Sequence, residues 1–224
     1  MNLRSDAIDI ILRDKDRNPV KPRTSGQDAF VEAVDKQEIV FVDGPAGTGK
    51  TFLAAALAVK FLREGRIERV VLTRPAVEAG EKLGFLPGSL EEKIDPSLRP
   101  LFDAIETLFT FEESARLLSN RQIEVIPLAF MRGRTLRKSF VVLDEAQNTT
   151  VAQMKMFLTR FGEGSRMIVA GDSSQRDLHA VENGFTDAMR RLGDLNGVSV
   201  ARLGRADIVR ADIIGRIIEA YDRS

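Results

Sequence analysis

The sequence predicts an α/β fold, a mostly parallel β-sheet with helices on both faces. Short continuous apolar runs, typical of strands buried on both sides, alternate with longer segments of helical periodicity. One apolar run, EIVFVD (38–43), leads directly into GPAGTGKT (44–51), the glycine-rich pattern of a phosphate-binding loop between a strand and a helix. These observations predict a P-loop NTPase domain.

Composition narrows the classes of function. The 224 residues are 43% hydrophobic and 29% charged, as in a soluble globular protein, and 33 basic residues balance 33 acidic ones. Any polyanion site must therefore be a local patch. The chain has no cysteine and a single histidine, His179, which excludes disulfides, thiolate zinc sites and histidine metal clusters and fits a cytoplasmic location. The charged start and the lack of a long apolar run predict no membrane association.

The expected elements follow in chain order. Residues 1–23 are expected to form an N-terminal extension, and residues 24–224 the ATPase domain, with an insertion at about 75–121 where the alternation of strands and helices lapses. The expected strands cover residues 38–43, 69–74, 139–145, 166–172 and 198–203. The expected helices cover residues 26–34, 51–65, 101–109, 149–162 and 206–221.

The loop at residues 44–51 matches the pattern G-x-x-x-x-G-K-[ST] without a mismatch. Its glycines let successive backbone N–H groups point at phosphate oxygens, and the helix that follows adds its positive end. Lys50 would reach the β- and γ-phosphates, and Thr51 would offer its hydroxyl to Mg²⁺. The predicted nucleotide-binding residues of this loop are Gly44, Pro45, Ala46, Gly47, Thr48, Gly49, Lys50 and Thr51.

Two acidic residues end a later apolar strand, in FVVLDEAQN (140–148). Asp144 would stand at the carboxyl end of its strand, where ligands bind in open α/β sheets, and would hold Mg²⁺ directly or through water. Glu145 would orient and polarise the attacking water. Both residues could instead cap the next helix, an alternative that weakens once the phosphate loop is considered.

Two glutamines complete the predicted site. Gln175 follows the strand in MIVAGDSSQ (167–175) together with Asp172, and it could sense the γ-phosphate or position water. Gln27, ahead of the phosphate loop, could pair with the adenine edge. The alternative for Gln175 is an ordinary turn after a strand, and the alternative for Gln27 is a surface glutamine at the start of a helix.

Six stretches in this order resemble the PhoH-like family of ATPases, over roughly residues 24–221. They are GPAGTGKT, TRPAVEAGEKLGFLPG, AFMRGRTL, LDEAQNTT, QMKMFLTRFG and AGDSSQRDL. The resemblance implies a RecA-like core similar to superfamily-one helicases, ATP and Mg²⁺ as cofactors, ATP hydrolysis and a link to RNA. It also implies that copies of the chain assemble into a homo-oligomeric ring, for which a hexamer is the expected size. Ala211 departs from the family pattern, in which histidine is common, while Arg210 is retained.

Arginine side chains are candidates to complete the ATP site by stabilising charge on the transferring phosphoryl group. Arg210 is the first candidate and Arg205 the second, while Arg74 could couple the state of the nucleotide to the insertion. A surface salt bridge is the alternative for each.

A basic cluster in MRGRTLRKS (131–139) comprises Arg132, Arg134, Arg137 and Lys138, with Arg121 nearby. It could contact the phosphates of RNA or single-stranded DNA. The chain has no tryptophan and one tyrosine, and its 13 phenylalanines are read mostly as core, so stacking partners for bases are not evident. A solvated loop or a subunit contact is therefore an equal alternative.

The function predicted from these observations is a Mg²⁺-dependent ATPase that couples hydrolysis to remodelling of RNA or single-stranded nucleic acid. The main alternative is an ATP-dependent switch or assembly scaffold without motor activity. A small-molecule kinase is less favoured because of the water-activating Glu145. The sequence lacks the N-K-x-D motif of GTPases and a further carboxylate cluster for a nuclease.

Overall fold

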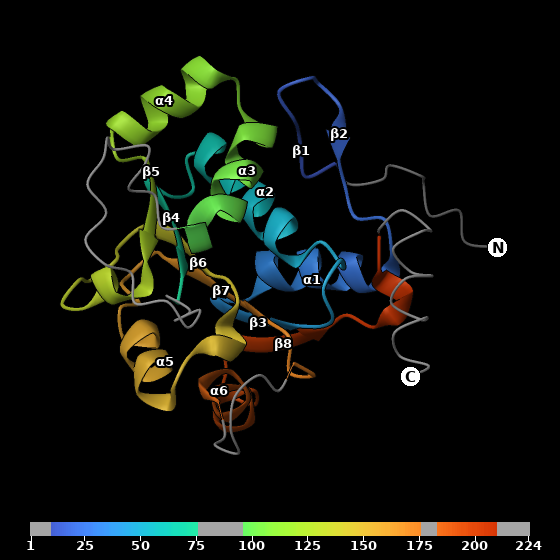
Figure 1. The fold of residues 1–224 in the computed structure, drawn as a ribbon, viewed down its shortest axis with the longest axis vertical. Coiled ribbons are helices and arrows are strands. Elements are labelled where there is room, and N and C mark those ends of the chain that lie inside the picture. The colour runs from blue at the N-terminus through green and yellow to red at the C-terminus, as the bar shows by residue number, and fades with distance from the viewer. Residues whose placement is uncertain (1–9, 76–95, 176–182, 210–224) are drawn as a thin grey trace.

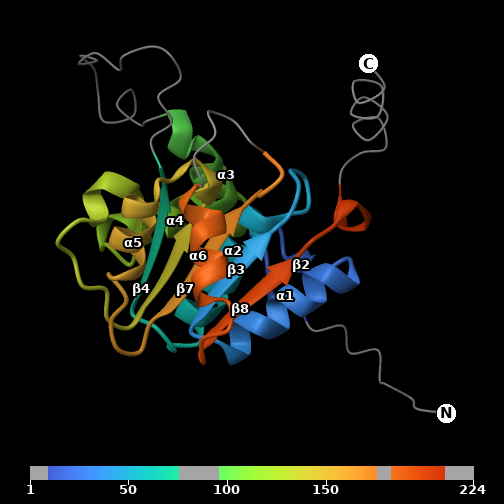
Figure 2. The ribbon, with the colours of Figure 1, turned by 90° about the horizontal axis from the view of Figure 1, so that it is seen from below.

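A six-stranded parallel sheet forms the centre of the protein. The computed structural model describes residues 10–75, 96–175 and 183–209, and it orders the strands β5-β4-β6-β7-β3-β8. Figure 2 shows neighbouring strands running in one direction, with α1 beside β8. The strands are β3 (Ile39–Asp43), β4 (Arg69–Arg74), β5 (Ile123–Pro127), β6 (Ser139–Leu143), β7 (Arg166–Gly171) and β8 (Val198–Arg202). The predicted parallel α/β sheet is confirmed.

Helices cover both faces of this sheet (Figure 1). Successive strand residues point to opposite faces, so Val40 and Val42 pack into one apolar core while Phe41, between them, packs into the other. The first core lies under α1 (Ser25–Lys36), α2 (Lys50–Arg63), α3 (Arg99–Leu108) and α4 (Phe111–Ser119). The second lies under α5 (Val151–Leu158) and α6 (Gly184–Leu192). Strands buried on both sides explain the continuous apolar runs of the sequence.

Helix α2 is buried nearly all round, as its apolar composition predicts. Eight of its residues between Leu53 and Phe61 are buried, because the helix lies between the sheet and α3. Five small alanine and valine side chains in this stretch, residues 54–59, let the helix approach the sheet closely. Close packing on both sides fixes the start of α2 at the carboxyl edge of the sheet.

In the main sheet and the helices that cover it, three of the described elements escaped the sequence-based prediction. The edge strand β5 falls in a stretch for which no strand was expected, because it is half exposed and contains Glu124 and Pro127, which weaken the apolar pattern. Helices α4 and α6 were not expected either. Their apolar residues are few, and both helices start from a local cap rather than from a long apolar run, with Thr110 and Asn183 as the capping residues.

The described residues before position 24 pack against the main core. Strands β1 (Leu12–Arg13) and β2 (Pro19–Val20) form an antiparallel pair that places Ile11, Leu12 and Val20 in the core shared with α2. The predicted domain boundary at residue 24 stays a prediction.

Most of the helix predicted at 206–221 lies outside the described residues, and the part inside contains a 3₁₀ turn, η4 (Arg205–Asp207). Within the described ranges, no helix has the length and apolarity needed to cross a membrane.

Candidate nucleotide-binding site

The phosphate loop connects the end of β3 to the start of α2, as the sequence predicts. Gly47 and Gly49 have φ angles of 89° and 77°, left-handed conformations that glycine adopts without steric cost. Gly44 has a different constraint, since a Cβ there would lie 2.7 Å from the carbonyl oxygen of Leu203. The glycine pattern is thus required by two tight backbone turns and one close approach.

The loop is held from outside by two elements. The side-chain amide of Gln27, on α1, donates to the carbonyl oxygen of Thr48 at 2.9 Å, and the backbone N–H of Val209 donates to that of Gly47 at 3.0 Å. Gln27 is 3% exposed, and its Oε1 accepts a hydrogen bond from the backbone N–H of Arg23. Both amide atoms of Gln27 therefore have backbone partners, and its predicted contact with adenine, which stays a prediction, would require one of these bonds to be exchanged.

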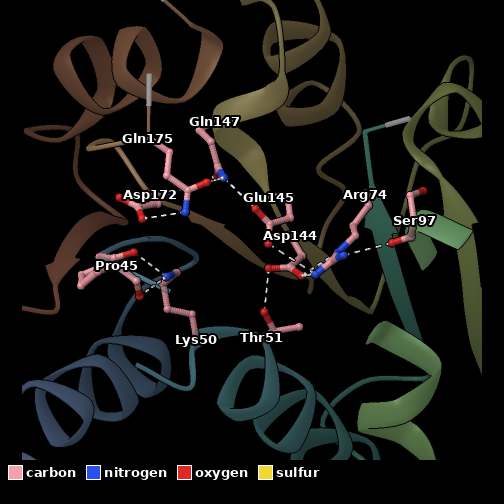
Figure 3. A network of polar contacts seen from close by, with 11 residues as sticks. Pro45, Lys50, Thr51, Arg74, Ser97, Asp144, Glu145, Gln147, Asp172 and Gln175 are labelled. Atoms are coloured by element: carbon pink, nitrogen blue, oxygen red, sulfur yellow. Dashed lines mark hydrogen bonds and ion pairs between the residues drawn. The ribbon is translucent and has the colours of Figure 1, made fainter. Parts of the chain in front are cut away.

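Lys50 lies at the base of the loop among carboxylates. Its Nζ donates to the carbonyl oxygens of Gly44 and Pro45, as Figure 3 shows for Pro45. Burial lowers the pKa of Lys50, and the nearby carboxylates of Asp172 and Asp144 oppose that shift by favouring the ammonium. The carbonyl contacts are ones that an incoming phosphate could replace with stronger charge-assisted bonds.

Asp144 connects the loop to the neighbouring strand. Its Oδ1 accepts a hydrogen bond from the Thr51 hydroxyl at 2.9 Å, and its Oδ2 accepts two from the Arg74 guanidinium, at 2.8 and 2.6 Å. Asp144 follows β6 and Arg74 ends β4, and these are adjacent strands of the sheet. Arg74 also donates to the carbonyl oxygen of Ser97 in η1 (Pro96–Leu98), so it links the carboxylate to the middle of the predicted insertion.

Glu145 has an unusual backbone conformation, with φ 54° and ψ 40°. Non-glycine residues enter this left-handed region at an energetic cost, and such strain often marks a functional position. The Glu145 side chain lines the same cavity as Lys50 and Thr51, and its Oε1 lies 3.5 Å from Arg74 Nη2. The tight turn after β6 thereby places two consecutive carboxylates at one cavity.

Gln147, in η3 (Ala146–Asn148), joins the two predicted catalytic strands. Its Nε2 donates to Glu145 Oε2 at 2.6 Å and to Gln175 Oε1 at 3.3 Å, while its Oε1 accepts the backbone N–H of Asp172 at 3.1 Å. Gln175 in turn donates to Asp172 Oδ2 at 3.0 Å (Figure 3). The sequence analysis assigned Gln147 no role of its own, although it follows Asp144 in the same short segment.

Asp43 is a second residue that the sequence analysis passed over. It ends β3, and its carboxylate accepts hydrogen bonds from the backbone N–H and the hydroxyl of Ser173, at 2.9 and 2.7 Å. Arg202, at the end of β8, donates to the same carboxylate at 3.2 Å. Asp43 therefore fixes the segment that carries Asp172 and Gln175. Its position at the end of a strand was the signal in the sequence.

Two cavities lie on either side of Gly49 and Phe52, which line both. One, of about 300 Å³, is also lined by residues of the loop, of the DEAQ segment and of the GDSSQ segment. The other, of about 520 Å³, is formed by the segment around β2, by Gln27 and by residues of α2 and α3. Both fall within or near the size range of small-molecule sites.

The remaining predicted site residues lie elsewhere. Arg205 begins η4, is exposed and lines neither cavity. Arg210 and His179 lie outside the described residues.

The four predicted RNA-binding residues do not act as one cluster. Arg134 pairs with Glu124 at 2.8 Å, and Lys138 pairs with Glu68 at 2.8 Å. Both carboxylates lie near the amino ends of β4 and β5, opposite the edge that carries the phosphate loop. Arg132 follows the carboxyl end of β5. The chain between residues 132 and 138 therefore returns along the sheet and separates these charges.

The donor set fits a magnesium ion held jointly with phosphate. Among the described residues no group of three histidine, cysteine or carboxylate side chains could bind a metal alone. Thr51 and Asp144 nevertheless place a hydroxyl and a carboxylate oxygen 2.9 Å apart at the mouth of the loop. Mg²⁺ keeps several waters and takes few protein ligands when phosphates complete its shell, so two oxygen donors suffice.

Comparisons with known proteins agree with this geometry. A family model described as PhoH-like protein matches residues 19–222. The chain is 52% identical over 205 residues to a PhoH-like protein of Bacillus subtilis and 53% identical over 206 residues to one of Synechocystis. These matches cover 91% and 92% of the chain but 64% and 63% of the relatives, so the chain spans less than two thirds of their length.

Solved structures share the fold at low sequence identity. The Hef helicase domain of Pyrococcus furiosus superposes with a TM-score of 0.50 and 14% identity, over 84% of this chain and 39% of that one. This likeness and the strand order identify a RecA-like α/β fold.

Proposed function

Because the chain belongs to the PhoH-like protein family, we propose that it is a Mg²⁺-dependent ATPase with its nucleotide on residues 44–51. One observation carries the proposal. Lys50 comes from the phosphate loop and Asp144 and Glu145 from the turn after β6, yet all three line one cavity at the carboxyl edge of the sheet. A cation, a metal-binding carboxylate and a strained second carboxylate at one phosphate loop are the components of phosphoryl transfer to water.

The phosphates are bound by the loop backbone and by Lys50. On binding, the Lys50 ammonium exchanges its two carbonyl partners for phosphate oxygens, which carry formal charge and make stronger hydrogen bonds. Thr51 and Asp144 would hold Mg²⁺, which would neutralise negative charge on the phosphates. The positive end of α2 adds to the same field.

Glu145 acts on water rather than on the nucleotide. Its carboxylate orients the attacking water and takes up a proton from it, while Gln147 holds one carboxylate oxygen in place at 2.6 Å. Gln175, fixed by Asp172 and Gln147, is the candidate to detect the γ-phosphate. Arg210 is the first candidate and Arg205 the second for the arginine that stabilises charge during transfer.

The base and ribose occupy the second cavity, of about 520 Å³, next to Gln27. Gly49 and Phe52 line both cavities, so a nucleotide with its phosphates at Lys50 continues into this space without leaving the protein surface. The wall contributed by Val20 and Lys21 belongs to the segment before α1. That segment thus has a role in nucleotide affinity.

The wider activity that we propose is ATP-driven remodelling of RNA or single-stranded DNA in the cytoplasm, by a homo-oligomeric ring. Its support is the family membership together with the basic residues that follow β5. The competing proposal is an ATP-dependent switch or scaffold, which needs the same nucleotide site but no nucleic acid.

The test of the ATPase proposal measures nucleotide binding and phosphate release separately. Wild-type protein is expected to bind a fluorescent ATP analogue with Mg²⁺ and to release phosphate, while Glu145→Gln keeps binding and loses release by about 10²- to 10⁴-fold. Glu163→Gln, an exposed carboxylate away from the cavity, is the matched control. Full phosphate release by Glu145→Gln would contradict the assignment, and transfer of phosphate to an added metabolite instead of water would favour a kinase.

A further inference from the structure

Two phenylalanines are strongly exposed in the described part of the chain, although the sequence assigns this residue type mostly to the core. Phe111 is 84% exposed at the start of α4, and Phe130 is 68% exposed in η2 (Leu128–Met131). Phe130 differs from Phe111 because it stands two residues before Arg132, directly ahead of the basic cluster at residues 131–139. An exposed ring two residues from an arginine supplies the stacking partner for bases that was not evident from the sequence.

We propose that Phe130 and Arg132 form a contact for single-stranded nucleic acid, with the ring stacking on a base and the guanidinium meeting a phosphate. The inference rests on the proposed ATPase function and adds the residues that contact its polymer. Single strands expose the faces of their bases, and base–aromatic stacking tolerates any sequence. A backbone phosphate follows every base, which places a charge where a neighbouring arginine can meet it.

The local structure fixes the ring in its exposed position. Leu128 and Met131 are 2% and 0% exposed in the second core. A 3₁₀-helix has three residues per turn, so side chains at positions i and i+3 lie one above the other, and the residues between them face away. Burial of Leu128 and Met131 therefore turns Phe130 outward. In the turn that follows, the backbone N–H of Arg134 donates to the carbonyl oxygen of Met131 at 3.2 Å, and Gly133 adopts a left-handed conformation.

Phe130 lies on the same edge of the sheet as the nucleotide site. Pro127, the last residue of β5, pairs in register with Arg74, which binds Asp144. Adjacent strands are about 4.8 Å apart, and three further residues add at most about 11 Å of chain. The Phe130 backbone thus lies within roughly 16 Å of that of Arg74. A strand bound at Phe130 would run close to the catalytic carboxylates.

The charge around Phe130 favours a polyanion. Residues 128–135 hold two basic side chains, Arg132 and Arg134, and no acidic one, whereas the whole chain has no net charge. Arg134 is paired with Glu124. In the described ranges no carboxylate pairs with Arg132, so its charge is available to a phosphate.

A protein partner fits this surface less well. An apolar peptide needs a groove, and the most apolar of the grooves found among the described residues lies between α5 and α6, lined by Met154, Leu158 and Leu192 among others. Phe130 lines none of the described cavities. A single ring beside a single cation matches a repeating base and phosphate instead.

The test compares variants for binding to a fluorescent 20-nucleotide oligouridylate and to oligothymidylate, by anisotropy over a range of salt concentrations. Phe130→Ala is expected to weaken binding by about 5- to 150-fold without changing the salt dependence, because a stack is lost but no charge. Phe130→Tyr should restore binding, since it keeps the ring. Arg132→Gln should make the plot of log binding constant against log salt concentration less steep by about 0.7, because one phosphate contact is lost.

Phe111→Ala and Arg116→Gln, at exposed positions of α4, are the matched controls and should bind like the wild type. Wild-type affinity in Phe130→Ala would overturn the inference while leaving nucleic-acid binding intact. No binding by the wild type, with ATP hydrolysis retained, would overturn it together with the remodelling activity but not the ATPase. A change in sedimentation of Phe130→Ala with unchanged oligonucleotide binding would assign the surface to contact between copies of the chain, against the proposal.

Discussion

The phosphate loop and the segment after β5 were both predicted to bind phosphate, and they behave differently. Residues 44–51 hold their predicted neighbours together, because Thr51 bonds to Asp144 and Lys50 lies among the predicted carboxylates. In the segment after β5, Arg134 and Lys138 turn to carboxylates near the opposite edge of the sheet. The phosphate loop is a short connection held at one end by β3 and at the other by the buried helix α2, whereas the segment after β5 is a longer connection whose side chains are not fixed in this way.

Lys50→Ala should have the largest effect at the phosphate loop. Removal of a charge aimed at the phosphates is expected to lower ATP turnover by on the order of 10²- to 10³-fold and to weaken nucleotide binding. Lys60→Ala, near the other end of the same helix, is the control and should retain activity. Steady-state phosphate release measures both. Equal activity in the two variants would remove the phosphate loop from the proposed chemistry.

Arg74→Ala tests the link between β4 and the carboxylates. Asp144 is 3% exposed, and loss of its cation is expected to lower the free energy of unfolding by about 3 kcal/mol. Arg99→Ala breaks the ion pair with Asp103, in which both side chains are more than half exposed. This variant should change the free energy of unfolding by less than about 1 kcal/mol. Urea denaturation compares the two. Equal stability would mean that Arg74 does not balance a buried charge.

Gln147→Ala tests the bridge between the two segments that we propose to be catalytic. The variant loses the hydrogen bonds to Glu145, Gln175 and Asp172, so Glu145 is less well positioned and turnover should fall by up to about 10²-fold. Nucleotide affinity should change much less, since Gln147 does not line the cavity. Gln153→Ala, an exposed cap residue of α5, is the control. An equal loss of affinity and turnover would contradict a role in positioning Glu145.

Lys138→Ala should have the smallest effect. In its ion pair with Glu68, the side chains of Lys138 and Glu68 are 65% and 70% exposed. The melting temperature is therefore expected to stay within about 3 °C of the wild type. Oligonucleotide affinity should also fall less than in Arg132→Gln, because Lys138 already has a carboxylate partner. A larger loss in Lys138→Ala, seen by anisotropy, would restore the idea of a single basic cluster.

The sequence predicted the parallel sheet and the residues that end its strands, for reasons that are physical. Val40 to Val42 and Phe140 to Val142 are apolar because both faces of these strands are covered, and that pattern can be read directly. Polar residues after such strands gather at one edge of a parallel sheet. Asp144 and Gln175 were predicted as site residues on this basis, together with the phosphate loop that precedes them in the sequence.

Other features depend on contacts that no local pattern records. Strand β5 tolerates Glu124 because its edge position leaves the side chain partly exposed, at 17%, so its apolar run is broken. LAFM (128–131) reads as a core segment, and only the burial of its first and last residues turns Phe130 outward. Gln147 acts through partners 28 and 25 residues away in sequence, which its own segment does not reveal.

The most direct measurement is steady-state ATP hydrolysis with Mg²⁺, with and without single-stranded RNA and DNA, in the wild type and in Glu145→Gln. The proposed function predicts hydrolysis that one polymer stimulates several-fold and that is lost in Glu145→Gln at every polymer concentration. Hydrolysis that depends on Glu145 but ignores both polymers would favour the switch or scaffold. Hydrolysis that survives in Glu145→Gln would contradict the central claim, that Glu145 activates water at the phosphate loop.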